Sequence, residues 1–168
     1  MTPIILASSS PFRQEQMTNL GFKFESLSPA VDERALEKNY NDPIENLSDF
    51  LAERKAKAIA QLNPEKVVIG SDQVLIYQGQ SWAKPETLAE VEKRLEALQG
   101  DTHELHTSVC VKFKEQTVIE KVVSSMSMHS LSQSEIKKYG KDFEKVFSIK
   151  PGISGLWQVS GRNNLSYD

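Results

Sequence analysis

A strand–turn–helix pattern near the N-terminus constrains this chain more than any other feature. A short apolar run, Ile4–Ala7, is followed by three serines, Ser8–Ser10, and then by Pro11 and Arg13 at the start of a helical spacing. Ser10 fits an N-cap and Pro11 a first helical position, so a capped helix alone explains the segment. A helix N-terminus also carries unpaired N–H groups and a partial positive charge, which makes it a candidate phosphate site.

The composition is that of a globular protein. The chain has 168 residues, of which 39% are hydrophobic and 26% charged, enough for one domain with a core. No apolar run approaches the ~20 residues that span a bilayer, and no signal peptide pattern is visible. The only cysteine is Cys110, which excludes an internal disulfide and fits a reducing cytoplasm. It lies in an alternating apolar pattern, so we expect its side chain to be buried. The net charge of −3 argues against nucleic-acid binding. We therefore expect a cytoplasmic protein with no membrane or nucleic-acid partner.

Strand and helix patterns alternate along the chain, which predicts an α/β domain. A loop is expected over 28–33, a hairpin turn at 78–81, and a capping box from Ser132 to Glu135. The expected strands cover residues 4–7, 22–27, 67–70, 74–77, 106–114 and 116–128. The expected helices cover residues 11–20, 44–62, 87–98 and 132–139.

Two charged residues occupy positions where apolar residues are expected. Lys55 follows Leu51 by four residues on the apolar stripe of the helix 44–62, so it either faces an anion or extends its ammonium to water. Asp72 interrupts an apolar stretch. A buried carboxylate must be paired, metal-bound or at a cleft edge, because burying it alone is costly. A turn between two strands explains Asp72 equally well.

Two further positions carry chemistry in a loop context. Pro85 holds Lys84 in an extended conformation, which would direct its side chain away from the chain. Alternatively, Lys84 is simply an exposed loop lysine. The pair Asp32-Glu33 supplies oxygens suited to a metal ion, or forms a solvated turn.

Taken together, these motifs resemble the Maf family of nucleotide pyrophosphatases over residues 3–139. The matching motifs, in the family's order, are Ser8-x-Ser10-Pro-x-Arg13, Val31-Asp32-Glu33, Ala52-Glu-Arg-Lys55-Ala56, Gly70-Ser71-Asp72-Gln73-Val74, Lys84-Pro85 and Leu98-Gln-Gly100-x-Thr102-His103-Glu104-x-His106-Thr107. The resemblance implies an α/β fold of the inosine-triphosphatase type, with a mixed sheet, flanking helices and a cleft between two lobes. It also implies hydrolysis of a nucleoside triphosphate to monophosphate and pyrophosphate with a divalent cation, Mg²⁺ or Mn²⁺.

The resemblance also implies residue roles. Asp72 would be the proton acceptor and, with Glu33, would hold the metal. An aromatic residue at Phe12 and a glutamine at Gln73 resemble the 7-methyl-GTP pyrophosphatases of the family, in which these positions tune base choice. The substrate-binding residues implied are Ser8, Ser10, Phe12, Arg13, Lys55, Gln73 and Lys84. Their cations suit a triphosphate, which carries about four negative charges.

The C-terminal part departs from the Maf pattern, whose closing segment is missing. Residues 139–168, with Lys150-Pro-Gly-Ile-Ser-Gly-Leu-Trp157, resemble a fragment of the bacterial polyprenyl-phosphate sugar-phosphate transferases. We therefore expect a C-terminally truncated Maf-like domain over 1–139 and a foreign tail over 140–168 that is not an independent domain. A catalytically impaired nucleotide-binding remnant and an accessory protein of polysaccharide synthesis are the alternatives. A homodimer would cover the sheet edge left open.

Overall fold

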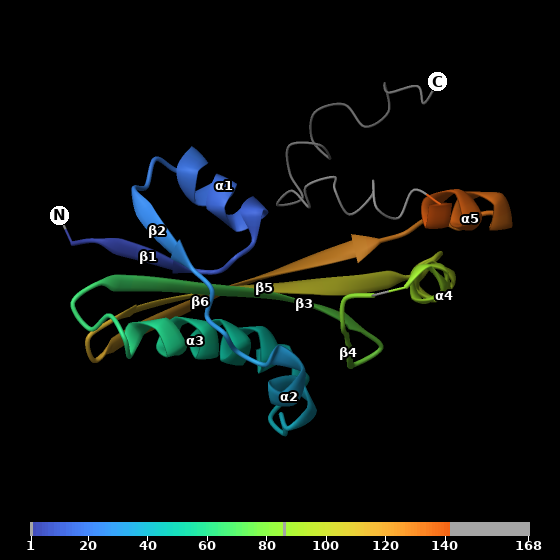
Figure 1. The fold of residues 1–168 in the computed structure, drawn as a ribbon. Coiled ribbons are helices and arrows are strands. Elements are labelled where there is room, and N and C mark those ends of the chain that lie inside the picture. The colour runs from blue at the N-terminus through green and yellow to red at the C-terminus, as the bar shows by residue number, and fades with distance from the viewer. Residues whose placement is uncertain (1, 86, 142–168) are drawn as a thin grey trace.

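A mixed six-stranded sheet organises the computed structural model, which describes residues 2–85 and 87–141 (Figure 1). The strand order is β2-β1-β3-β5-β6, and β4 pairs with β3 outside this path. The strands are β1 Ile4–Ala7, β2 Phe24–Leu27, β3 Val67–Tyr77, β4 Gln80–Trp82, β5 Thr102–Phe113 and β6 Gln116–Ser127. The helices are α1 Pro11–Asn19, α2 Glu33–Lys38, the 3₁₀ turn η1 Ile44–Asn46, α3 Leu47–Ala60, α4 Leu88–Leu98 and α5 Gln133–Lys141.

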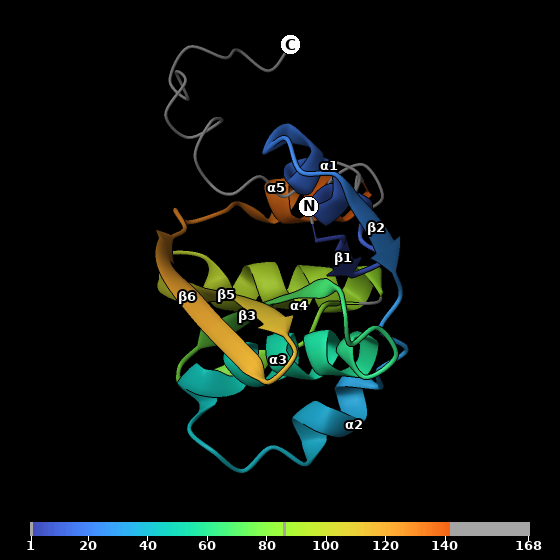
Figure 2. The same cartoon turned by 90° about the vertical axis from the view of Figure 1, so that its left-hand side faces the viewer.

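Parallel and antiparallel pairing divide the sheet into two parts. Strand β1 pairs in parallel with β2 and β3, whereas β3 pairs antiparallel with β4 and β5, and β5 with β6. Figures 1 and 2 show α1 above the sheet and α3 below it. This arrangement confirms the α/β fold with a mixed sheet and flanking helices.

The helix starts follow local sequence signals. Ser10 caps α1 by accepting a hydrogen bond from the Arg13 N–H, with Pro11 in the first turn as expected. The predicted capping box of α5 forms, since the Glu135 N–H donates to Ser132 Oγ and the Ser132 N–H donates to the Glu135 carboxylate. Thr87 and Glu90 form the same kind of capping box at α4, which was not predicted.

The core lies between α3 and the centre of the sheet. Buried apolar side chains from β1, α3, β3 and β5 meet there, namely Ile5, Ala7, Ala52, Ala56, Ile59, Val68 and Cys110. Gly70 on β3 lies against Ala52, because a Cβ at this position would come within 2.3 Å of the Ala52 carbonyl oxygen. Only glycine lets α3 approach β3 this closely, and that approach places Lys55 beside β3.

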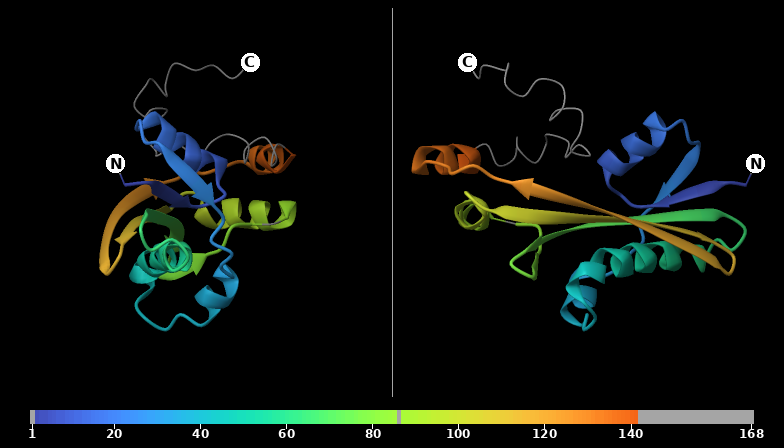
Figure 3. Two further views of the ribbon diagram at one scale, coloured as in Figure 1. Left: turned by 60° about the vertical axis from the view of Figure 1, so that its left-hand side comes forward. Right: turned by 180° about the vertical axis from the view of Figure 1, so that it is seen from behind.

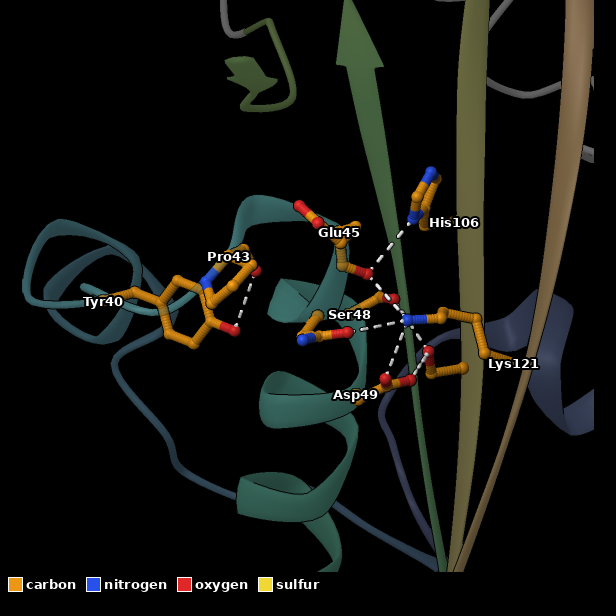
Figure 4. A network of polar contacts seen from close by, with 9 residues as sticks. Tyr40, Pro43, Glu45, Ser48, Asp49, His106 and Lys121 are labelled. Carbon is orange, nitrogen blue, oxygen red and sulfur yellow. Dashed lines mark hydrogen bonds and ion pairs between the residues drawn. The ribbon is translucent and has the colours of Figure 1, made fainter. Parts of the chain in front are cut away.

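A polar network fixes the start of α3 to β5 and β6 (Figure 4). Lys121 on β6 donates to the Glu45 carbonyl at 2.8 Å and to the Asp49 carboxylate at 2.9 Å. Ser108 on β5 donates to the same carboxylate at 2.6 Å and lies 2.7 Å from the Ser48 hydroxyl. Ser48 and Ser108 are buried, and a connected set of hydrogen bonds of this kind holds the elements in one arrangement. The network therefore orients the helix that carries Lys55.

The structure corrects three sequence expectations. Strand β3 is continuous over Val67–Tyr77, so the turn considered at Ser71–Gln73 is wrong. The reason is that β5 pairs with β3 from Val68 to Ile76 and supplies ladder partners throughout. The loop expected over 28–33 ends at Asp32, which caps helix α2, so Glu33 begins a helix that was not predicted. The helix expected over 44–62 ends at Ala60, so Leu62 lies beyond it and is 80% exposed.

The remaining expectations concern the cysteine, membrane-spanning helices and the C-terminal tail. Cys110 is buried in the core, as expected. No helix in the described part of the chain combines the length and apolar character needed to cross a membrane. The tail predicted for 140–168 falls, from residue 142 onward, outside the described residues.

Candidate active site

A gap in strand pairing marks the candidate site. Along one edge of β3, parallel pairing with β1 ends at Ile69, and antiparallel pairing with β4 begins at Leu75. Within the described residues, the intervening segment 70–74 therefore has no strand on this edge. Ligands of open α/β sheets bind at such positions beyond the end of a strand, where the chain leaves room beside the backbone.

Asp72 lies at this gap and forms a buried ion pair with Lys55 of α3. The Lys55 Nζ donates to Asp72 Oδ1 at 2.5 Å and lies 2.9 Å from Glu33 Oε2 at the start of α2. The Asp72 and Lys55 residues are 5% and 4% exposed, whereas the Glu33 side chain is 47% exposed. Lys55 thus faces inward onto two carboxylates. Of the two alternatives that the sequence left open, it contacts anions and does not extend its ammonium to water.

The electrostatics of Asp72 suit a proton acceptor. Burial raises the pKa of its carboxyl, the ammonium of Lys55 and its hydrogen bond lower it, Glu33 raises it and Arg13 lowers it. The net result is a pKa above the usual aspartate value. A carboxylate with a raised pKa is a stronger base than an ordinary one, and such groups cluster at functional sites.

The serine-rich turn before α1 borders the same gap. The Ser8 hydroxyl accepts a hydrogen bond from the Ser10 N–H at 3.1 Å and a long one from the Arg13 guanidinium at 3.5 Å. Ser8 is 5% exposed and follows directly on β1. Because Arg13 also acts electrostatically on Asp72, the turn and the ion pair belong to one site. The N-terminus of α1 and Arg13 together can bind an anion.

Glu37 is a neighbour of the site that was not predicted from the sequence. It lies one turn after Glu33 on α2 and is half-buried. Burial raises the pKa of its carboxyl, as do the negative charges of Asp72 and Glu33, while Lys55 lowers it. Glu33 and Glu37 are four residues apart, a spacing that places two side chains on one face of a helix. No helix was predicted for these residues, so the spacing did not identify Glu37.

The remaining predicted residues lie away from the ion pair. Gln73 follows Asp72 on β3 and so points to the opposite sheet face, where its Nε2 donates to Thr107 Oγ1 at 2.7 Å. Phe12 is half-buried in the first turn of α1, and Lys84 is exposed in the extended segment after β4. Their assignments to base selection and phosphate binding stay predictions.

A divalent cation fits the donor chemistry of the site. Within residues 2–85 and 87–141, no group of three His, Cys, Asp or Glu side chains is arranged as a metal site. The Glu33 and Asp72 carboxylates nevertheless converge on one ammonium, and Mg²⁺ is commonly held by one or two carboxylates together with substrate phosphates. Glu33 and Asp72 are therefore the residues that would hold the cation.

Comparison with known proteins points in the same direction. The profile of the family described as Maf-like protein matches residues 3–152, which extends beyond the expected boundary at 139. A nucleoside triphosphate pyrophosphatase of Rhodopseudomonas palustris is 36% identical over 95% of this chain and 78% of its own length. A dTTP/UTP pyrophosphatase of Desulforamulus reducens is 38% identical over 83% of this chain and 72% of its own length. A 7-methyl-GTP pyrophosphatase of Brucella abortus is 32% identical over 94% of this chain and 80% of its own length.

A solved structure supports the fold. The nucleoside-triphosphatase / dITP/XTP pyrophosphatase of Mycobacterium abscessus superposes with a TM-score of 0.50 at 12% sequence identity, covering 92% of this chain and 100% of that one. The likeness agrees with the inosine-triphosphatase type of fold expected from the sequence.

Proposed function

Because the chain belongs to the Maf family and is a Maf-type nucleoside triphosphate pyrophosphatase, a hydrolase, we propose that Asp72 is its proton acceptor and that the strand gap is its active site. The observation that carries the proposal is the buried Asp72–Lys55 pair with Glu33 beside it. The expected products are a nucleoside monophosphate and pyrophosphate.

In this mechanism the protein supplies a base and a set of positive charges. Asp72 orients a water molecule and accepts its proton as the water attacks phosphorus in line. Lys55 pairs with Asp72, and Arg13 acts on the same carboxylate electrostatically. Both cations neutralise the charge that develops on the phosphate oxygens. The N-terminal turn of α1, with Ser8 and Ser10, and the exposed Lys84 bind the rest of the triphosphate. Binding the substrate would draw Lys55 toward phosphate and free Asp72 to act as a base.

The divalent cation, Mg²⁺ or Mn²⁺, would be held by Glu33 and Asp72. Bound there, it supplies Lewis acidity and further neutralises the phosphate charge. The excess of carboxylates around Lys55, with Glu37 as a third negative charge nearby, suits a cationic ligand.

For the substrate, we propose 7-methyl-GTP. An aromatic ring at Phe12 can stack on the cationic methylated base, a contact worth about 0.5–2 kcal/mol, and Gln73 offers both a donor and an acceptor to a base edge. The relatives include enzymes named for 7-methyl-GTP and for dTTP/UTP, so a direct comparison of substrates is needed. We further propose that the enzyme acts in the cytoplasm and forms a homodimer.

A nucleotide panel tests the function. The full chain would be incubated with 7-methyl-GTP, GTP, dTTP or UTP and with Mg²⁺ or Mn²⁺, while pyrophosphate and orthophosphate are measured separately. We expect equal amounts of monophosphate and pyrophosphate, and the highest kcat/KM for 7-methyl-GTP. Release of orthophosphate alone, or no turnover of any nucleotide by folded protein, would contradict the pyrophosphatase and indicate a nucleotide-binding remnant. A preference for dTTP or UTP would overturn the substrate but not the reaction.

A further inference from the structure

Gln73 and Thr107 form a cross-strand pair on the sheet face opposite to α3. They are direct partners in the β3–β5 ladder, so their side chains share a face. Their neighbours, Asp72 and Ser108, are also partners and face α3, where Ser108 contacts Asp49. The Gln73 Nε2 donates to Thr107 Oγ1 at 2.7 Å, although Gln73 itself is exposed. A long polar side chain is thus held in place on an open surface.

Apolar side chains extend the same surface beyond this pair. Thr107 is the ladder partner of Val122 on β6, which is 65% exposed, and Val109 on β5 is 39% exposed. Seen from behind in Figure 3, α1 and α5 stand apart above this face of the sheet. An apolar surface beside one oriented amide suits a flat ring that carries a polar edge.

The gap in strand pairing connects this surface with the ion pair. Asp72 and Gln73 are consecutive residues on the segment of β3 that no described strand covers on the β1 side. A ligand whose phosphates lie at Lys55 and Arg13 can therefore pass the free edge of β3 and place its base near Gln73. The two side chains leave the backbone from adjacent residues of β3 and point to opposite faces of the sheet.

The hydrogen bond to Thr107 determines what Gln73 offers to a base. An amide that donates one Nε2 hydrogen to Thr107 is held with its carbonyl Oε1 free as an acceptor and its second Nε2 hydrogen left as a donor. Guanine and 7-methylguanine present two adjacent donors on one edge, N1–H and the N2 amino group. Uracil and thymine present a single N–H between two carbonyl acceptors. A fixed Oε1 therefore favours the guanine type of edge.

We propose that Thr107 is a positioning residue for base selection, which holds the Gln73 amide so that its Oε1 faces the base. The proposal rests on the proposed function in taking as the ligand a nucleoside triphosphate whose phosphates lie at Lys55 and Arg13. It assigns Thr107 no contact with the reacting phosphate.

Binding of non-hydrolysable nucleotides tests this role independently of turnover. The α,β-methylene analogues of GTP and UTP would be titrated calorimetrically into the wild type, Thr107→Val and Thr107→Ser. Losing one hydrogen bond should reduce the preference for the guanine analogue about 3- to 10-fold in Thr107→Val. Thr107→Ser, which keeps the hydroxyl, should retain the preference. Thr102→Val is the matched control, since it removes another cross-strand hydroxyl contact of β5, that with Ser127.

Each result has a defined meaning. An unchanged guanine preference in Thr107→Val, an equal loss in Thr102→Val, or failure of Thr107→Ser to retain it would overturn the positioning role. Selective binding of the analogues by a protein that hydrolyses no nucleotide of the panel would overturn the pyrophosphatase function and leave the role of Thr107 intact. Absence of binding of either analogue to the folded wild type would overturn both.

Discussion

Removing the positive charge of Lys55 should destabilise the protein in a pH-dependent way. Lys55→Met keeps the length of the side chain but leaves Asp72, which is 5% exposed, without its ammonium partner. Glu33 loses the same partner but is half-exposed and can be solvated. The cost therefore falls on Asp72, and breaking a buried ion pair typically costs about 3–5 kcal/mol.

Protonation of Asp72 limits that cost. Lys55 lowers the pKa of Asp72 against the effect of burial, so the pKa of this carboxyl rises further when the ammonium is removed. A group whose pKa is raised in the folded state contributes stability below its unfolded pKa and loses it as the pH rises through the folded pKa. Protonating a carboxyl costs about 1.4 kcal/mol per pH unit above an unfolded pKa of about 3.9, hence about 4 kcal/mol at pH 7 and about 1.5 kcal/mol at pH 5.

Thermal unfolding followed by circular dichroism measures this effect. At about 2–4 °C per kcal/mol, a loss of about 3–4 kcal/mol lowers the melting temperature of Lys55→Met by about 6–16 °C at pH 7, and by much less at pH 5. Lys57→Met, at an exposed position of the same helix, is the matched control and should melt like the wild type. Adding Asp72→Asn to Lys55→Met should restore most of the stability. Equal melting of Lys55→Met and the wild type at pH 7, or a loss independent of pH, would refute the reasoning.

Three further outcomes are expected. Because burial raises the pKa of Asp72 and the mechanism needs its deprotonated form, kcat/KM should fall as the pH is lowered, at a pH above the usual aspartate range; a flat profile down to pH 4 would argue against Asp72 as the base. Burial raises the pKa of the Cys110 thiol to about 11, so a thiol reagent at pH 8 should modify Cys110 only in the unfolded protein; rapid labelling of native protein would show that the core around it opens. Removal of residues 142–168, which include apolar positions such as Ile153, Leu156 and Trp157, should lower the melting temperature or cause aggregation; a fragment of residues 1–141 that is soluble and equally stable would show that the tail is not needed.

Local signals predicted most of the secondary structure. The Ser10-Pro11 start of α1 and the Ser132–Glu135 box of α5 need only neighbouring residues, so the sequence reveals them. Strand β3 was harder, because Ser71–Gln73 look like a turn when read alone. Their strand conformation depends on β5, more than 30 residues away in the chain, which pairs with them along the ladder. Long-range pairing of this kind overrides local propensity.

The site was predicted in part for the same reason. Inward-facing Lys55 and buried Asp72 were visible as charges in apolar patterns, and the structure brings them together at 2.5 Å. The contribution of Glu37 could not be foreseen, because it depends on helix α2 and on how α2 packs near α3. The separation of Asp72 and Gln73 onto opposite faces also required knowing that β3 is continuous.

The central claim is that Asp72 is the catalytic base of a nucleotide pyrophosphatase. The most direct measurement is pyrophosphate release from the preferred nucleotide by Asp72→Asn, compared with the wild type and with Asp42→Asn, a control at an exposed loop position. The account predicts a loss of at least about 10²-fold in kcat for Asp72→Asn, with an unchanged circular dichroism spectrum, and wild-type turnover by Asp42→Asn. Near-normal turnover by folded Asp72→Asn would contradict it.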